Sequence, residues 1–280
     1  MDRNREKELA LFAAKLRKNV LLQVYSAKSG HPGGSLSIAD ILSYLYNVEM
    51  KIDPKNPNDP DRDRFVLSKG HAAPGIYAAL ALKGYFDSEE LKLFRNIKGI
   101  LQGHPDKKGV PGIDMSSGSL GQGISAACGM AIAAKKTGKS YRVYAIIGDG
   151  EIEEGQVWEA AMFAAHYKLD NLMVFLDLNG LQIDGKTDDV MSSAPADEKF
   201  KAFGWNVINI DGHSFEDIEK ATKLARETKG KPTIAVCHTI KGKGVSYMEN
   251  QVSWHGAAPN DEQYAQGIAE LDAAIAALEG

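Results

Sequence analysis

Residues 141–185 constrain the fold of this chain more than any other segment. The apolar stretch 143–147 ends in a Gly-Asp-Gly turn, and a stretch of helical periodicity follows Gly155. A second apolar stretch then ends at Asn179. Strand, helix and strand in this order form the crossover unit that joins parallel strands. We therefore expect an α/β fold built on a parallel sheet.

The rest of the chain continues this alternation. Helices are expected over residues 6–26, 37–49, 74–84, 88–97, 124–136, 197–203, 215–228 and 261–278, and further strands over 64–67, 205–210 and 233–238. Residues 100–123 form a glycine-rich loop, and long loops inside compact domains are usually functional. The pattern predicts one domain, residues 1–280, with a parallel sheet flanked by helices on both faces.

The composition excludes several classes of protein. The net charge is −4, with acids and bases interspersed, so nothing indicates a surface for nucleic acid. No apolar run is long enough to span a membrane, and the N-terminus lacks the apolar core of a signal peptide. Cys128 and Cys237 lie in apolar stretches, which is typical of buried thiols in a reducing compartment. We expect a soluble cytoplasmic protein.

Two polar residues mark the turns of the 141–185 segment as a candidate ligand site. Asp149 lies in the first turn, and Asn179 ends the second strand. In open α/β sheets, ligands collect at the carboxyl edge, and a helix N-terminus there favours phosphate. Both side chains, with the carbonyl of Leu181 and two diphosphate oxygens, can supply the oxygen ligands that Mg²⁺ prefers. Alternatively, both residues serve only as turn formers.

Histidines in glycine-containing loops add a second signal. Four of the seven histidines lie in such loops, namely His31, His71, His104 and His255. Imidazoles can bind phosphate oxygens or move protons near neutral pH. The other three are interpreted as structural: His166, His213 and His238.

These motifs together resemble a known family. SGHPGG, SKGHA, QGHP, SSGSLGQG, GDGEIEEGQVWEA, DLNGLQIDG and a late HG occur in this order between His31 and Gly256. This order is similar to that of the N-terminal half of transketolases, which depend on thiamine diphosphate. The resemblance implies the diphosphate-binding domain of thiamine-dependent enzymes.

The resemblance also implies a role for each matching residue. Asp149, Asn179 and the Leu181 carbonyl would bind Mg²⁺ or Ca²⁺. His71, Gly150 and His255 would contact the cofactor diphosphate, Gly118 and Leu120 would line the cofactor site, and Ile183 and Ile240 would pack against its rings. Without the resemblance, both isoleucines are equally well read as core residues.

The resemblance implies that further matching residues would contact the substrate or a neighbouring chain. His31, His104 and His255 would hydrogen-bond substrate hydroxyls and relay protons. Glu154 would act at the catalytic and cofactor site, and Glu154 and Glu159 match acids of a carboxylate network between neighbouring chains. Both glutamates can equally be acids of a first helical turn, which the helix dipole favours.

The chain departs from the family in lacking its second half. In transketolases that half supplies the glutamate that activates the cofactor and the groups that bind the sugar phosphate. The final helix leads us to expect a complete chain, one subunit of a split transketolase. It would be inactive without a C-terminal partner, and we expect two copies of each chain. The complex would transfer a two-carbon ketol unit from a ketose phosphate to an aldose phosphate, as in the pentose phosphate pathway.

Other functions stay open at this point. The KGKG sequence at 241–244 departs from the usual transketolase loop and leaves the substrate open. The alternatives are a deoxyxylulose phosphate synthase-like enzyme, a transketolase for a modified sugar, or a non-catalytic cofactor-binding subunit. The alpha chain of a 2-oxoacid dehydrogenase lacks this set of Gly-His-Pro loops. A nucleotide-binding protein is disfavoured because no GxxxxGK[ST] or GxGxxG motif follows a strand.

Overall fold

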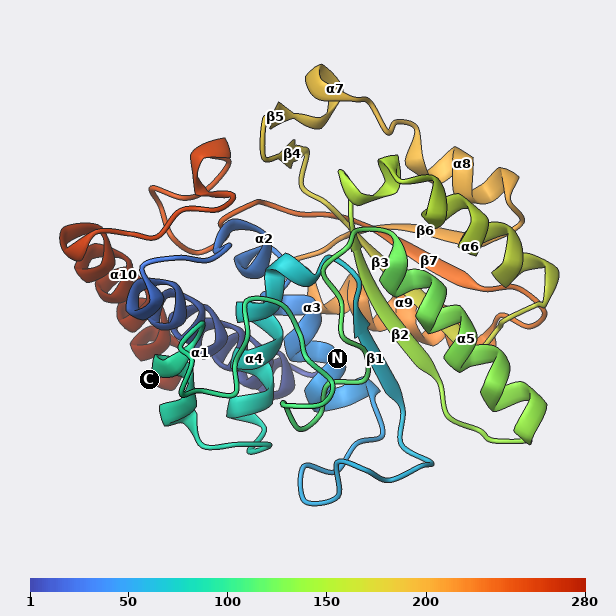
Figure 1. Ribbon diagram of the computed structural model, residues 1–280, viewed down its shortest axis with the longest axis horizontal. Helices are drawn as coiled ribbons and strands as arrows, with labels where there is room; N and C mark the ends of the chain where they lie inside the picture. Colours follow the sequence, from blue (N-terminus) through green and yellow to red (C-terminus); the bar gives the residue numbers. More distant parts are fainter.

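The centre of the molecule is a parallel sheet of five strands, as the sequence predicts (Figure 1). Its spatial order is β1-β2-β3-β7-β6, and every neighbouring pair is parallel. The strands are β1 (Arg64–Leu67), β2 (Val143–Gly148), β3 (Leu172–Leu178), β6 (Asn206–Asp211) and β7 (Thr233–His238). The computed structural model describes all residues, 1–280. The predicted fold class is confirmed.

The side chains of the interior strand β2 divide between two apolar cores. Tyr144 and Ile146 belong to a core on one face of the sheet, whereas Val143, Ala145 and Ile147 belong to the core on the other face. Successive side chains of a strand point to opposite faces, so a strand buried on both faces is apolar throughout. This is why the sequence shows an uninterrupted apolar run here.

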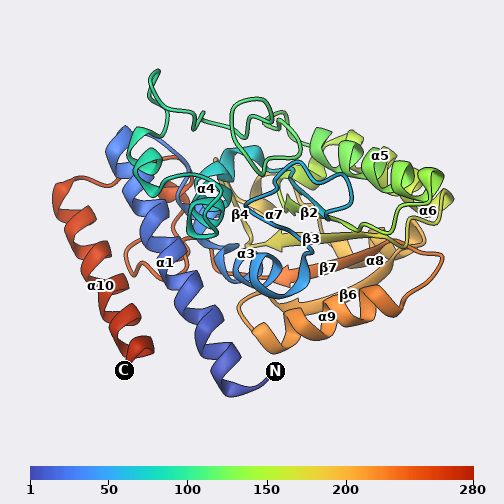
Figure 2. The ribbon, with the colours of Figure 1, turned by 90° about the horizontal axis from the view of Figure 1, so that it is seen from below.

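Helices cover both faces of the sheet. Figure 2 shows α5 (Gln122–Thr137) and α6 (Gly155–His166) on one side, and α3 (Ala39–Tyr44) and α9 (Phe215–Glu227) on the other. The short α8 (Ala196–Ala202) joins the α5–α6 side. None of the helices combines the length and the apolar character needed to cross a bilayer.

The first and last helices form an additional layer beside the sheet. Helix α1 (Arg3–Ala27) packs against α4 (Ala73–Leu82) and against α10 (Asp261–Glu279). The rings of Tyr25 and Tyr264 stack at 3.9 Å where α1 and α10 meet. Helix α10 begins at a capping box in which the Asn260 side chain accepts from the backbone of Gln263. The layer therefore ties both ends of the chain to one body.

Several local elements differ from the predicted ones. The expected helix over 37–49 consists of α3 followed by a π-helical turn (Leu45–Glu49). The expected helix over 88–97 is a shorter 3₁₀ segment (Ser88–Leu93), because Arg95 adopts a positive φ of 59° that no right-handed helix continues. A short helix, α2 (Gly33–Leu36), lies inside the expected SGHPGG loop. Further 3₁₀ turns lie at Gly70–Ala72, Glu151–Glu153 and Val252–Trp254.

A small hairpin after β3 was not predicted. It consists of β4 (Leu181–Gln182) and β5 (Gly185–Lys186), and the one-turn helix α7 (Thr187–Val190) follows it. Two-residue strands carry no periodicity that a sequence pattern could reveal. The hairpin matters because β4 forms part of the wall of the candidate site.

Candidate active site

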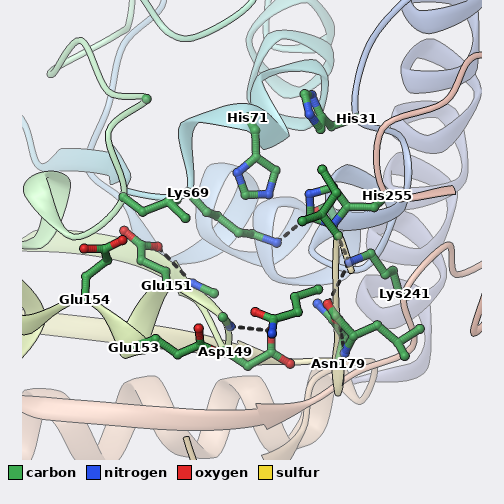
Figure 3. Close-up of a pocket in the computed structure, with 18 residues that line it drawn as sticks. His31, Lys69, His71, Asp149, Glu151, Glu153, Glu154, Asn179, Lys241 and His255 are labelled. Carbon is green, nitrogen blue, oxygen red and sulfur yellow. Dashed lines mark hydrogen bonds between the residues drawn. The ribbon is translucent and has the colours of Figure 1, made fainter. Parts of the chain in front are cut away.

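A pocket of about 360 Å³ opens at the carboxyl edge of the sheet (Figure 3). Its wall contains the turn after β2, the loop after β3, and loops that precede α4, α5 and α10. The predicted site residues in this wall are His31, His71, Gly118, Leu120, Asp149, Gly150, Glu154, Asn179, Leu181, Ile183 and His255. The structure therefore brings eleven predicted residues, which span most of the chain, into one cavity.

Three predicted residues lie outside this wall. The exposed His104 lies next to Gly118, where a Cβ atom would be 3.2 Å from its ring. Ile240 is half-buried and directly precedes the pocket residue Lys241, and Glu159 lines a separate hollow between α5 and α6. Ile183 lines the pocket but is 62 % exposed, so the alternative reading of Ile183 as a core residue is wrong.

The glycine-rich loop predicted to be functional reaches the pocket by a close backbone contact. A Cβ atom on Gly70 would lie only 2.7 Å from the backbone nitrogen of Gly118. Glycine is the residue that allows such an approach between two backbones. The contact places the loop that carries Gly118 directly beside the turn that carries His71.

The Asp149 carboxylate is held in place by backbone groups of both predicted turns. Its Oδ1 accepts from the Gly150 N–H at 2.9 Å, and its Oδ2 accepts from the Gly180 N–H at 2.6 Å. Asp149 is 3 % exposed, and burial together with the nearby Asp177 charge raises its pKa to about 6. The group forms no direct bond to a cationic side chain, so a metal cation there would supply the missing positive charge.

Asn179 and Leu181 complete the predicted oxygen set on the neighbouring loop. The Asn179 Oδ1 accepts from the Leu181 N–H at 3.1 Å, and its Nδ2 donates to Asp177 at 2.8 Å. One carboxylate, one amide oxygen and one carbonyl oxygen at a single sheet edge suit Mg²⁺ or Ca²⁺.

A buried ion pair at the pocket wall, between Lys69 and Asp177, was not predicted from the sequence. The Lys69 Nζ lies 2.6 Å from the Asp177 carboxylate, and the two side chains are 2 % and 0 % exposed. The Ser37 hydroxyl donates to the same carboxylate at 2.7 Å, and Thr239 donates to its other oxygen. Although burial alone would raise it, the Lys69 ammonium and the hydroxyl donors hold the pKa of Asp177 below its usual value. An aspartate inside an apolar strand was the available signal, since a buried charge needs a partner.

A second missed residue, Glu151, connects three segments around the pocket. Its carboxylate accepts from the Ser68 hydroxyl and from the backbone N–H groups of Gly121 and Gly148, at 2.9 and 3.0 Å for the two amides. Glu151 is 2 % exposed. One side chain thus fixes the end of β2, the end of β1 and the start of α5 relative to one another.

The third missed residue is Lys241, the first lysine of the KGKG sequence. It is 2 % exposed, and its Nζ donates to the Leu181 carbonyl at 2.7 Å and contacts the His255 Nδ1 at 2.8 Å. Burial lowers the pKa of Lys241 to about 8. The pocket therefore contains a cation that could face an anionic ligand.

Three predicted histidines form a cluster next to Lys241, at the upper right of Figure 3. The ring centroids of His31, His71 and His255 are 5.2–5.6 Å apart. Burial lowers the pKa of His31 to about 4 and that of His255 to about 3, and it lowers the pKa of His71 well below its usual value. These imidazoles are neutral at pH 7, so each can both donate and accept a hydrogen bond.

We expect stability to fall as the pH drops below 6.5, because the native state resists protonation of His31. The pKa of His31 is about 4 in the native state against 6.5 ordinarily. Below 6.5 the unfolded chain takes up a proton that the native chain does not, so stability is lost as the pH falls towards 4. Urea midpoints measured between about pH 6.5 and 5 should decrease less in His31→Gln than in the wild type. A matched control is His166→Gln, at an exposed position of α6, and an equal decrease in all three proteins would contradict the prediction.

The comparison with protein families identifies the domain. The model of the transketolase thiamine diphosphate-binding domain matches residues 10–272. The Campylobacter jejuni transketolase structure superimposes with a TM-score of 0.88 and 32 % identity, covering 99 % of this chain and 46 % of that one.

Similar curated proteins fall into two groups by length. A 6-deoxy-6-sulfo-D-fructose transketolase subunit from Clostridium sp. strain MSTE9 is 48 % identical, covering 92 % of this chain and 94 % of the relative. An apulose-4-phosphate transketolase subunit from Phocaeicola vulgatus is 43 % identical, with 97 % and 96 % covered. Human transketolase is also 43 % identical, but this chain spans only 40 % of its length. The predicted resemblance is confirmed, and the chain belongs to the transketolase family, whose thiamine diphosphate-binding domain it carries.

Proposed function

We propose that this chain is the cofactor-binding subunit of a two-chain transketolase. With a C-terminal partner subunit, the complex transfers a two-carbon ketol unit from a ketose phosphate to an aldose phosphate. The observation that carries the proposal is the convergence of Asp149, Asn179 and three loop histidines in one pocket. The length of the subunits named among the relatives, which this chain matches almost end to end, supports the two-chain arrangement.

Thiamine diphosphate and Mg²⁺ (or Ca²⁺) are the proposed ligands of the pocket. The metal would be bound by Asp149, Asn179 and the Leu181 carbonyl, and the diphosphate by His71 and by neighbouring backbone groups. When bound, the cofactor supplies the nucleophilic carbon and the electron sink for cleavage beside a carbonyl. The protein contributes positioning, charge compensation and exclusion of water.

The loop histidines of this chain would hydrogen-bond to the sugar substrate. Because His31 and His255 are neutral at pH 7, they can hydrogen-bond to substrate hydroxyls without a charge change. Lys241 contacts the His255 Nδ1, so the neutral His255 ring carries its proton on Nε2 and can donate it there. His104, just beyond Gly118, would extend this row of polar groups outward.

The assembly, the location and the pathway belong to the same proposal. We propose a complex of two copies of each chain in the cytoplasm, acting in sugar-phosphate metabolism such as the pentose phosphate pathway. In this proposal the partner supplies the activating glutamate, which in the family lies in the part of the protein that this chain does not span. Glu154 at the start of α6 is exposed beside the pocket, where it could meet another chain.

A transketolase for a modified sugar is the second candidate. Two relatives of similar length and identity are named for different substrates, 6-deoxy-6-sulfo-D-fructose and apulose-4-phosphate. These names support the alternative, because chains this similar to ours serve more than one substrate. In this proposal the pocket binds the cofactor, and the partner subunit contacts the part of the sugar that lies farthest from the cofactor.

The direct test is cleavage of a ketose phosphate with thiamine diphosphate and Mg²⁺. The assay uses this chain alone, the product of the neighbouring gene alone, and the mixture. Activity only in the mixture supports the two-chain enzyme, and activity with a sulfo-sugar but not with the ketose phosphate supports the second candidate. Activity of this chain alone would refute the requirement for a partner.

His104→Ala should impair donor turnover while leaving cofactor affinity nearly unchanged. His104 lies beside Gly118 but outside the pocket wall, so its loss removes a substrate contact only. We expect kcat/KM for the donor to fall by about 10–100-fold, the effect of losing one hydrogen bond worth about 1–3 kcal/mol. Steady-state kinetics and calorimetry of cofactor binding separate the two effects, with His166→Ala as the control. Loss of cofactor binding with normal donor kinetics would refute this role.

A further inference from the structure

A chain of polar contacts leads from outside the pocket to the segment that carries Lys241. His213, in the turn after β6, contacts the Asp40 Oδ2 through its Nδ1 at 2.7 Å. Arg17 of α1 binds both oxygens of Asp40, at 3.1 and 2.5 Å. The side chains of His213, Asp40 and Arg17 are only 14, 9 and 9 % exposed. His213 is a structural residue by its sequence context, and no contact places it in the pocket wall.

The direction of these hydrogen bonds is fixed by the backbone. The Ile240 N–H donates to the His213 Nε2 at 2.9 Å. An amide N–H can only donate, so Nε2 must present its lone pair and the ring proton must lie on Nδ1. That proton then points to Asp40, and the paired guanidinium keeps the carboxylate in position as an acceptor. One tautomer of His213 therefore satisfies both neighbours at once.

The contact at Ile240 anchors one end of the segment 240–244. Immediately after it, Lys241 turns into the pocket and reaches the Leu181 carbonyl and His255. The Gly242 N–H donates to the Gly33 carbonyl at 3.0 Å. At the far end, a Cβ atom on Gly244 would lie 2.8 Å from the Cδ of Arg17. Arg17 thus supports both the Asp40–His213 pair and the end of the segment.

We propose that His213 is a positioning residue for Lys241 and acts through the Ile240 amide. A buried ammonium on a flexible side chain is useful only if its backbone is fixed, because ordering the chain and desolvating the charge both cost free energy. The Arg17–Asp40–His213 contacts supply that fixed point before any ligand arrives. The proposal rests on the proposed function, since Lys241 would face the cofactor diphosphate.

Two matched variants separate the two bonds of His213. In His213→Gln the amide oxygen can occupy the place of Nε2 and accept from Ile240, whereas in His213→Asn the amide can only reach the place of Nδ1 and donate to Asp40. We expect His213→Asn to weaken thiamine diphosphate binding by about tenfold, the effect of losing the hydrogen bond from the partly buried Ile240 amide, and His213→Gln by less than about threefold. Calorimetry on the complex with Mg²⁺ measures both.

A double-mutant cycle tests whether the effect passes through Lys241. In a Lys241→Met background, His213→Asn should cause no further loss of affinity, because the group that it positions is already absent. An equal loss in both backgrounds, or equal binding by the Asn and Gln variants, would overturn the proposal even though the wild type binds the cofactor.

A ligand-free readout distinguishes failure of this inference from failure of the proposed function. In the full chain labelled with ¹⁵N-histidine, the His213 ring should show a protonated Nδ1 and an unprotonated Nε2 at neutral pH. The Ile240 amide should exchange slowly with solvent in the wild type and in His213→Gln, and rapidly in His213→Asn. A His213 ring protonated on Nε2 would overturn the positioning role, whereas failure of the wild type to bind thiamine diphosphate would refute only the proposed function.

Discussion

Replacing Asp149 with alanine is expected to abolish Mg²⁺-dependent binding of thiamine diphosphate. The carboxylate is the only acidic member of the proposed metal-ligand set, and its orientation is fixed by the amides of Gly150 and Gly180. Even loss of a group that merely orients a metal ligand costs about 10–100-fold in metal affinity, so loss of the ligand itself should exceed about 100-fold. Calorimetry of the reconstituted complex at varied Mg²⁺ measures the loss.

An exposed aspartate near the same region provides the control. Asp189 lies on α7, is exposed, and is not part of the pocket wall. Asp189→Ala should bind cofactor and metal as the wild type does. If Asp149→Ala retains wild-type affinity at every Mg²⁺ concentration, the metal assignment is wrong, and Asp149 serves the turn alone.

Lys69→Met should destabilise the protein more than any single change at an exposed position. It would leave the Asp177 carboxylate, which is 0 % exposed, without its cation. Breaking a buried ion pair by removing one partner costs about 3–5 kcal/mol, because the remaining charge stays buried and uncompensated. Urea unfolding followed by circular dichroism measures the change in the free energy of unfolding.

Two further variants identify the cause of that loss. Adding Asp177→Asn to Lys69→Met removes the uncompensated charge while keeping a polar group for the Ser37 hydroxyl, so most of the stability should return. Lys220→Met breaks the exposed pair with Glu216 on α9 and should leave the midpoint unchanged. A double variant as unstable as Lys69→Met would show that packing of the lysine stem, and not charge, is responsible.

The sequence predicted the parts of the fold whose hydrophobic pattern is long. Strand β2 and helices α1, α9 and α10 were expected within a few residues of their observed bounds, because each buries a continuous run or stripe of apolar residues. The hairpin β4–β5 was missed because its few residues are half-exposed and pair only with each other. Its position depends on the loop after β3 and not on any local pattern.

In the site, too, residues in local motifs were predicted from the sequence, whereas residues defined only by contacts between distant parts of the chain were not. The histidine loops and the Gly-Asp-Gly turn were recognisable because their residue types and their order carry the signal. Lys69 and Asp177 were missed because they are 108 residues apart in the chain and are defined only by their mutual contact. His213 was recognised only as structural, since nothing adjacent to it in the sequence indicates Asp40 or Ile240.

The two apolar cores on either side of β2 differ in the sizes of the side chains that they take from this strand, and this difference affects the position of Asp149 at the end of the strand. A large ring at Tyr144 and a single methyl group at Ala145 fill cavities of very different size on opposite faces. Sliding the strand by one position would force each into the space shaped for the other. The shapes of these interior side chains, which never touch a ligand, therefore fix the register of the strand. The register in turn determines how deep the Asp149 carboxylate lies in the pocket. Substitutions deep in either core could thus alter the affinity of the pocket while leaving every residue of its wall unchanged.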